Sequence, residues 1–175
     1  LQLEYSLVDR NIEREHIPVA QELGIGICPW SPLAGGLLAG KYKREGQPGS
    51  LKGRLDIQKA DGSTIIERFT EYNWKIVEVL VDVAKQMSRP PAEVALNWVA
   101  TQPGVTSTII GATKVDQLAS NLSSLDFTIP TELRARLDQA GAPDPLAHPY
   151  VFFGRAIQSR VTGGTVVRPW SRSDG

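Results

Sequence analysis

The chain has 175 residues, which is ordinarily enough for one domain with a sizeable core. Its 19 basic and 19 acidic residues cancel, so neither the basic surface of a nucleic-acid-binding protein nor an acidic tail is visible. No apolar run is long enough to span a membrane, and the single cysteine, Cys28, excludes an internal disulfide and favours a reducing, cytoplasmic setting.

The first part of the chain predicts a strand, a helix and a second strand. Apolar and polar residues alternate over residues 1–7, as in a strand with two different faces, one of which carries Gln2 and Glu4. A helix is expected from about Glu15 to Leu23, with Gly24 as its C-cap. Residues 25–30 are almost entirely apolar, which is typical of a strand buried on both sides.

A loop with unusual chemistry follows the second strand and reads W-S-P-L-A-G-G from Trp30 to Gly36. Trp30 offers a flat aromatic face, although packing in the core would explain it equally well. The Ser31 hydroxyl and the amides of residues 33–36 can surround a pyrophosphate, and the two glycines permit close approach. Lys41 adds a positive charge, or is simply a solvated loop lysine.

The next stretch predicts a long loop and two helices. Residues 44–62 are rich in glycine, proline and charge, and loops of this length are usually functional or disordered. Thr64 and Glu67 form a capping-box pattern that predicts a helix through Lys85. Pro91 suits the first position of a further, mostly apolar helix that contains Trp98.

The stretch from Thr106 to Leu122 predicts a strand, a glycine turn and a helix. The strand covers residues 108–110, Gly111 lets the backbone turn, and Thr113 and Asp116 suit the helix N-terminus. Free amides and the helix dipole make this turn an anion site, to which Lys114 adds a full charge.

The same helix has two faces. Val115, Leu118, Ala119 and Leu122 recur at helical spacing on an apolar face. Gln117 and Asn121 lie one turn apart on a polar face that can read a polar ring beside the anion. An ordinary βα unit with a capped surface helix is the simpler alternative. A last helix is expected from Thr131 to Gly141, followed by a proline-rich tail.

Two runs, I-C-P-W-S-P-L-A-G-G-L-L-A-G-K-Y from Ile27 and G-A-T-K-V-D-Q-L-A-S-N-L from Gly111, resemble the aldo-keto reductases. The similarity is to their long-loop branch, which includes the β subunits of potassium channels. It implies an α/β fold: the C-terminal part of a (β/α)8 TIM barrel, with about three βα units, a terminal helix and a tail. Residues 1–175 would then be one partial barrel that begins at the sixth strand.

The resemblance also implies an NADP(H) site. It gives Gln2 a hydrogen bond to the nicotinamide carboxamide, stacks Trp30 on that ring, and aligns Arg54 with a loop arginine. Lys114 would meet the 2′-phosphate, which NAD lacks. The residues expected to bind the cofactor are Gln2, Trp30, Ser31, Pro32, Leu33, Ala34, Gly35, Lys41, Arg54, Gly111, Thr113, Lys114, Gln117 and Asn121.

The activity that the resemblance implies is the NADP(H)-dependent reduction of an aldehyde or ketone, a small-molecule carbonyl substrate, to an alcohol. Such enzymes use a tyrosine, a lysine, an aspartate and usually a histidine from earlier strands, so no catalytic residue is assigned here and this chain alone is expected to be inactive. Two alternatives stay open: a non-enzymatic NADP-binding regulatory subunit and an inactive truncated remnant. No nucleic-acid, membrane or metal partner is expected, and a homo-oligomer is left open.

Overall fold

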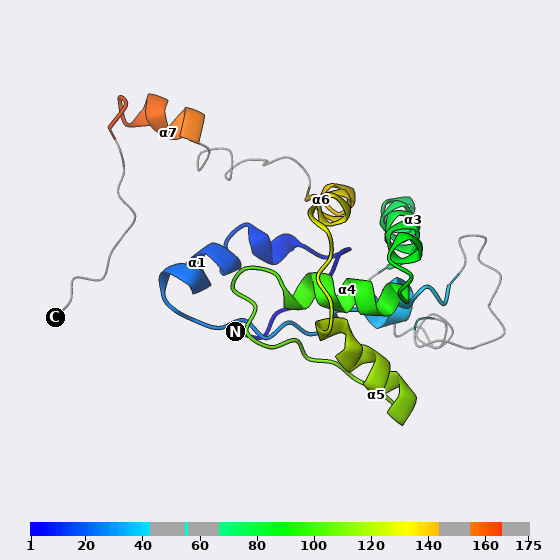
Figure 1. Cartoon of the computed structure of the whole chain (residues 1–175). Coiled ribbons are helices and arrows are strands. Elements are labelled where there is room, and N and C mark those ends of the chain that lie inside the picture. Colours follow the sequence, from blue (N-terminus) through cyan, green and yellow to red (C-terminus); the bar gives the residue numbers. More distant parts are fainter. Residues whose placement is uncertain (43–54, 56–66, 144–154, 166–175) are drawn as a thin grey trace. The chain divides into compact units, whose positions relative to one another are not determined.

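The computed structural model describes residues 1–42, 55, 67–143 and 155–165 (Figure 1). By internal contacts the chain divides into two units, Leu1–Ala142 and Pro143–Gly175, each of which is described by itself. The helical elements, in chain order, are η1 (Asn11–Glu13), α1 (His16–Glu22), η2 (Ala34–Ala39), α3 (Glu71–Gln86), α4 (Pro91–Ala100), α5 (Val115–Leu122), η3 (Ser123–Leu125), α6 (Thr131–Ala140) and α7 (Arg155–Val161), the η elements being 3-10 helices.

Three extended segments of the first unit run parallel to one another. The Cys28 amide donates to the Leu1 carbonyl at 2.7 Å, and the Thr106 amide donates to the Ile27 carbonyl at 2.8 Å. The segment 25–30 therefore lies between residues 1–6 and residues 105–109. This order is that of consecutive strands in a parallel sheet, with helices in the connections.

The prediction of three regular strands was wrong in its detail. The described segments pair only through isolated bridges, Glu4 with Trp30 and Ile27 with Val105 in parallel. Pro29 interrupts the central segment because it has no amide to donate. The third segment pairs from Val105 onward, three residues before the predicted strand at 108–110.

The predicted alternation along residues 1–7 holds only in part, because Leu1 is exposed and Ser6 is as fully buried as its neighbours. Tyr5 and Leu7 are fully buried, and the Tyr5 ring lies 5.5 Å from the Trp98 ring on α4. Gln2 is exposed and Glu4 is half-buried, and in an extended chain both point to the opposite face from Tyr5. The helices thus cover one face of the extended segments and leave Gln2 and Glu4 on the other.

The predicted helix after the first segment is confirmed as α1, and Gly24 ends it as expected. Gly24 has a φ of 65°, and the Ile25 amide donates back to the Ala20 carbonyl at 2.7 Å, closing the helix end.

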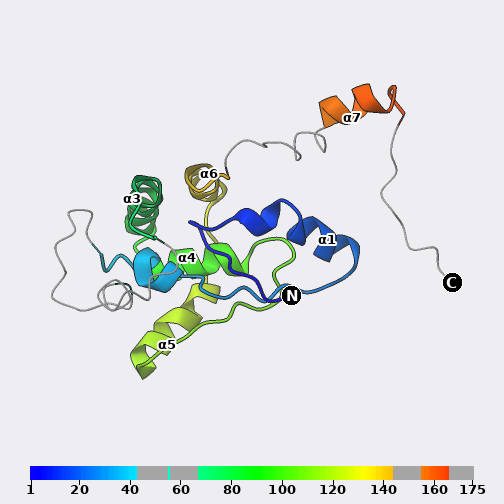
Figure 2. The ribbon, with the colours of Figure 1, turned by 180° about the vertical axis from the view of Figure 1, so that it is seen from behind.

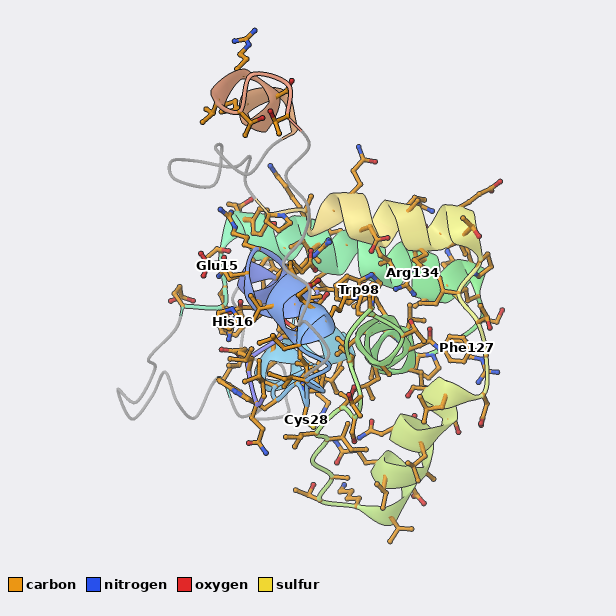
Figure 3. The ribbon with its side chains drawn as sticks, turned by 90° about the vertical axis from the view of Figure 1, so that its left-hand side faces the viewer. Glu15, His16, Cys28, Trp98, Phe127 and Arg134 are labelled. Carbon is orange, nitrogen blue, oxygen red and sulfur yellow. The ribbon has the colours of Figure 1, made fainter. Side chains whose placement is uncertain are left out.

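The helical core is built around α4. Helix α3 packs against both α4 and α6, and α5 packs against α4, as Figures 1 and 2 show from opposite sides. Pro91 is the first residue of α4, as predicted. Trp98, labelled in Figure 3, is fully buried and donates from Nε1 to the Asp138 carboxylate of α6 at 2.7 Å.

The prediction for the start of α3 was wrong. Thr64 lies outside the described residues, and residues 67–70 are not helical. The helix begins at Glu71, where the Thr70 side chain accepts a hydrogen bond from the Asn73 amide. The Glu67 carboxylate instead accepts from the Phe69 amide at 2.8 Å. A threonine six residues later than predicted therefore caps the helix.

Helix α5 also differs from its prediction. Its N-cap position is Lys114, with no side-chain cap, so neither Thr113 nor Asp116 caps it. Its predicted apolar face is not covered within the described residues: Val115 is 83% exposed, and Leu118 and Leu122 are exposed as well. A helix with this much exposed apolar surface lacks the packing partner that its sequence pattern predicts.

The second unit contains α7, a short helix in the tail for which no regular structure was predicted. Tyr150, Phe152, Phe153 and Trp170 lie outside the described residues. Across the part of the chain that the structure describes, no helix combines the length and apolar character that crossing a membrane requires.

Candidate functional site

The two motif segments meet at the same ends of the parallel segments. The Ile109 amide donates to the Pro29 carbonyl at 2.8 Å, one residue before Trp30 and two before Gly111. Elements η2 and α5, which follow these two ends, both pack on α4. The loop after Trp30 and the turn after Ile110 are therefore neighbours, although about 80 residues separate them.

The aromatic ring at this end is only partly covered. Trp30 is 44% exposed, so core packing does not account for it. Its amide donates to the Leu3 carbonyl, and its carbonyl accepts from the Tyr5 amide at 3.3 Å. These bonds hold residue 30 beside residues 3–5. Gln2 belongs to the same segment and is exposed. A flat ring and a carboxamide thus stand on adjoining segments.

The loop from Ser31 to Gly36 winds through left-handed backbone conformations. Ser31, Ala34, Gly35 and Gly36 all have positive φ, from 48° to 97°. For the serine and the alanine this is costly, by about 1–2 kcal/mol each. A loop that bears such strain at two non-glycine positions is held by its surroundings, and such strain often accompanies a binding function.

Part of the predicted amide nest is used inside the loop itself. The Ala34 amide donates to the Ser31 carbonyl at 2.8 Å, and the Gly36 amide donates to the Leu33 carbonyl at 2.9 Å. Among the described residues, no backbone carbonyl accepts from the amides of Leu33 and Gly35. The nest predicted from four consecutive amides is therefore reduced to these two.

Gly35 does not face open space. A Cβ atom built on Gly35 would lie 2.7 Å from Cδ2 of the buried Leu55. In the described structure, the absence of a side chain at Gly35 therefore makes room for Leu55 and not for a ligand. Pro32 is buried at the base of the loop, and Lys41 is exposed beyond it. Arg54 lies outside the described residues.

The turn after Ile110 is open. A Cβ atom built on Gly111 would have no described atom within 4 Å, and this glycine is not in the left-handed region. Lys114 is exposed and extended, with a φ of −136°, at the N-terminus of α5. The Thr113 amide donates to Gln117 Oε1 at 3.1 Å. Gln117 therefore satisfies a free amide before the start of α5, the role that the sequence pattern predicts for Thr113 and Asp116.

Asn121 is buried with an unused donor. Its side chain is 5% exposed, and its Nδ2 has no hydrogen-bond partner among the described residues. A buried amide without a partner is costly and calls for an explanation. It lies one helical turn from Gln117 on the face predicted to read a polar ring.

Two buried polar residues of α4 hold this helix in place, and sequence patterns gave no reason to single them out. The Ser120 hydroxyl donates to the Glu93 carboxylate at 2.8 Å. Asn97 Nδ2 donates to the carbonyls of Ser124 and Phe127, at 2.7 and 2.8 Å, in the turn after α5. The sequence signal that could have pointed to them is the occurrence of two polar residues in an otherwise apolar helix.

A charged cluster lies at the end of the first segment. The Glu4 carboxylate accepts a hydrogen bond from the Arg68 guanidinium, and the nearby Ser31 side chain acts to lower the pKa of Glu4. Arg68 Nη1 also lies 3.8 Å from the Asp9 carboxylate. Desolvation by burial raises the pKa of Glu4 above its ordinary 4.5, even though Arg68 acts to lower it. Sequence analysis noted Glu4 without a role and missed Arg68, which follows a long loop.

The described residues offer no obvious catalytic proton donor. The Tyr5 hydroxyl donates to Glu13 at 2.6 Å, and burial together with that carboxylate raises the pKa of Tyr5. The Tyr72 hydroxyl donates to the Ala142 carbonyl at 3.0 Å. No cluster of three or more His, Cys, Asp or Glu side chains suited to a metal ion occurs within the described ranges.

The loop after Trp30 and the turn at Gly111 could each bind one end of a dinucleotide. A half-exposed indole and a carboxamide suit a flat, amide-bearing ring. The space at Gly111 and the cation at Lys114 suit a phosphate at a helix N-terminus. The unpaired Asn121 donor is shielded from solvent, so it would meet an acceptor atom of an adjoining base only after its side chain turns.

Comparisons with known proteins give a consistent result. The model of the aldo/keto reductase family matches residues 1–142. The uncharacterized oxidoreductase YrpG of Bacillus subtilis is 34% identical over 137 residues, 78% of this chain and 38% of that protein. A probable voltage-gated potassium channel subunit beta of Oryza sativa is 34% identical over 128 residues, 71% of this chain and 38% of that protein.

L-glyceraldehyde 3-phosphate reductase of Escherichia coli is 33% identical over 137 residues, 77% of this chain and 39% of that protein. The chain therefore spans about two fifths of the length of the curated relatives it matches.

Proposed function

The chain belongs to the aldo/keto reductase family, and we propose that it forms the cofactor-binding part of an NADP(H)-dependent oxidoreductase that reduces aldehydes or ketones to alcohols. The five preceding βα units of the barrel would supply the catalytic residues. We call this chain joined to those units, from its own upstream sequence or from a relative, the completed protein. The completed protein would act in the cytoplasm on a small carbonyl substrate.

A partial barrel explains two features of the fold. Three parallel segments in the order 1–6, 25–30 and 105–109 leave an unpaired edge on each side. In a closed (β/α)8 barrel the missing units would pair with both edges and pack against the apolar face of α5. The exposed side chains of Val115, Leu118 and Leu122 are then barrel packing surface.

The observation that carries the proposal is the hydrogen bond between the Ile109 amide and the Pro29 carbonyl. It joins the ends of two segments whose following turns hold Trp30 and Ser31 on one side and Gly111 and Lys114 on the other. In parallel barrels, active sites form at these ends of the strands. One extended ligand could therefore contact both motifs.

The bound cofactor would supply a hydride. Trp30 would stack on its nicotinamide ring and Gln2 would hold the carboxamide, which together fix the orientation of the ring. Ser31 and the amides of Leu33 and Gly35 would bind the pyrophosphate, with Lys41 and Arg54 as further cations. Gly111, Thr113 and Lys114 would hold the 2′-phosphate, and Gln117 and Asn121 the adenine.

A regulatory subunit is the second candidate, because a probable potassium channel subunit beta shares 34% identity with this chain. Such a protein would use the same cofactor site without requiring catalysis. The sequence of the upstream units separates the two: an enzyme carries the tyrosine, lysine and aspartate and usually the histidine, and a non-enzymatic regulatory subunit does not need them.

The proposal is tested by steady-state reduction of a panel of aldehydes and ketones by the completed protein, followed as NADPH oxidation. Turnover with NADPH is expected, together with quenching of Trp fluorescence on cofactor binding. Cofactor binding without turnover of any carbonyl would favour the regulatory subunit. Absence of NADPH binding to a folded completed protein would refute the proposal.

A further inference from the structure

The Arg68 cluster, defined as Glu4, Asp9, Ser31 and Arg68, connects three parts of the chain that are far apart in sequence. Arg68 precedes α3, Glu4 lies in the first segment with Asp9 in the turn that follows it, and Ser31 opens the loop of the proposed pyrophosphate site. The side chains of Arg68 and Glu4 are only 9% and 12% exposed. Their ion pair is therefore a largely buried contact and not a surface pair.

The backbone of Arg68 is fixed independently of its charge. Its carbonyl accepts a hydrogen bond from the buried Asn73 side chain at 2.9 Å. The next residue, Phe69, stacks on Trp74 with ring centroids 5.9 Å apart and meets Tyr42 edge-on at 5.3 Å. The guanidinium thus approaches Glu4 from an anchored segment.

Ser31 needs support that the Glu4 carboxylate can give. Its φ of 57° is unfavourable for any residue with a Cβ atom. Ser31 follows Trp30, which pairs with Glu4 in the parallel bridge, so its hydroxyl lies near a carboxylate that can accept from it. Such a hydrogen bond would offset part of this cost and fix the direction of the hydroxyl. Removing that acceptor would free the first residue of the loop.

The charges in the cluster matter because of what the loop would bind. A bare carboxylate beside Ser31 would repel the phosphates of a cofactor, most strongly where water is excluded. The raised pKa of Glu4 indicates such desolvation. The positive charge of Arg68 offsets that of Glu4, its hydrogen-bonded partner. Asp9, 3.8 Å from the guanidinium and more exposed than Glu4, adds a second negative charge that water screens better.

We infer that Arg68 and Glu4 are positioning residues of the cofactor site: their ion pair holds Ser31 in its strained conformation and neutralises a carboxylate beside the phosphates. The inference rests on the proposed function. It predicts that Arg68 is needed for cofactor affinity chiefly because Glu4 is charged. Neither residue touches the cofactor in this scheme.

The test is a set of variants of the completed protein: Arg68→Met, Arg68→Gln, Glu4→Gln, and both Arg68 changes combined with Glu4→Gln. Arg136→Met is the matched control, because Arg136 also pairs with a carboxylate, Asp82 at 2.6 Å, in an exposed position on α6. NADPH affinity is measured by fluorescence titration at several salt concentrations, and kcat at saturating NADPH is measured separately.

Arg68→Met is expected to raise the NADPH Kd at least tenfold while kcat at saturating NADPH changes by less than about threefold, because charge repulsion acts on binding. Adding Glu4→Gln should recover most of this loss, since it removes the repelling charge and keeps an acceptor for Ser31. Higher salt should reduce the difference in NADPH Kd between the wild type and Arg68→Met, because it screens the repulsion between Glu4 and the phosphates. The control variant should bind NADPH normally.

An Arg68→Met protein with unchanged Kd, or one that Glu4→Gln does not rescue, would overturn the inference. If Arg68→Met does not fold, Arg68→Gln provides the same measurements, because glutamine keeps a donor for Glu4. Failure of every Arg68 variant to fold would assign the pair a purely structural role and overturn the inference as well. Failure of the wild type to bind NADPH would instead refute the proposed function.

Discussion

Replacing Asn121 by leucine should improve the fold and damage the site. The Nδ2 group of this residue has no partner among the described residues, and the side chain is 5% exposed. A buried donor left unpaired costs about 1–3 kcal/mol. Leucine is similar in size and carries no polar atom. The cofactor-free Asn121→Leu protein is therefore expected to gain about 1 kcal/mol of unfolding free energy.

Cofactor binding should change in the opposite direction. If Nδ2 donates to the adenine, Asn121→Leu leaves the acceptor of the cofactor without its partner in a buried place. A loss of about 1.4 kcal/mol is then expected, which is about tenfold in the NADPH Kd. Urea unfolding of the cofactor-free completed protein and fluorescence titration with NADPH give the two quantities. If Asn121 served only the fold, its replacement would not raise the unfolding free energy and weaken NADPH binding at the same time.

Asn97→Leu is the matched control. Asn97 is as deeply buried, but its Nδ2 donates to two carbonyls, of Ser124 and Phe127. Its replacement leaves both carbonyls unpaired and should cost about 2 kcal/mol or more. If Asn121→Leu instead destabilises the protein as Asn97→Leu does and leaves the NADPH Kd unchanged, Asn121 serves the fold and our reasoning about it is refuted.

Three further outcomes are expected. Residues 1–175 expressed alone should aggregate or lack a cooperative thermal transition. The reason is that the described parallel segments have unpaired edges and that Val115, Leu118 and Leu122 are exposed. A monomer with a sharp thermal transition would contradict this. Gly111→Ala should leave the melting temperature unchanged, since no described atom lies within 4 Å of the added Cβ, and should weaken NADPH several-fold in titrations; unchanged affinity would show that no ligand approaches there. Glu4, which faces Arg68 and Asp9, has a raised pKa in the fold and so binds more protons there than in the unfolded chain. Its contribution to the free energy of unfolding should therefore fall as pH rises from 4.5 through the folded pKa. Urea unfolding at several pH values gives the difference in unfolding free energy between the wild type and Glu4→Gln, and a difference that does not decline over this range would disprove the expectation.

Local patterns predicted the family and the presence of the main helices of the first unit, although not the start of α3 or the cap of α5. The end of α1 at Gly24 and the start of α4 at Pro91 follow from residue types with narrow backbone preferences. The resemblance to the aldo-keto reductases is confirmed by the match over residues 1–142. The assignment of each residue to the cofactor stays a prediction.

Features that depend on distant contacts were less accessible. Thr64 and Glu67 form the better capping-box pattern, but Thr70 caps α3. The start of this helix depends on where the preceding loop returns to the fold, which the local pattern does not reveal. The central segment 25–30 has a neighbour on each side, and yet it pairs only through isolated bridges, because Pro29 cannot donate. The contact between Glu4 and Arg68 spans 64 residues, and no periodicity connects them.

The central claim is that Lys114, exposed at the start of α5, binds the 2′-phosphate of NADP(H). The most direct measurement is the ratio of the NADPH and NADH dissociation constants of the completed protein before and after Lys114→Ala. A charge-assisted contact contributes roughly 1.5–3 kcal/mol, so NADPH should weaken about tenfold or more while NADH hardly changes. Salt should lower the wild-type preference for NADPH. Equal losses for both cofactors would mean that Lys114 supports the fold or the pyrophosphate, and the NADP(H) assignment would be contradicted.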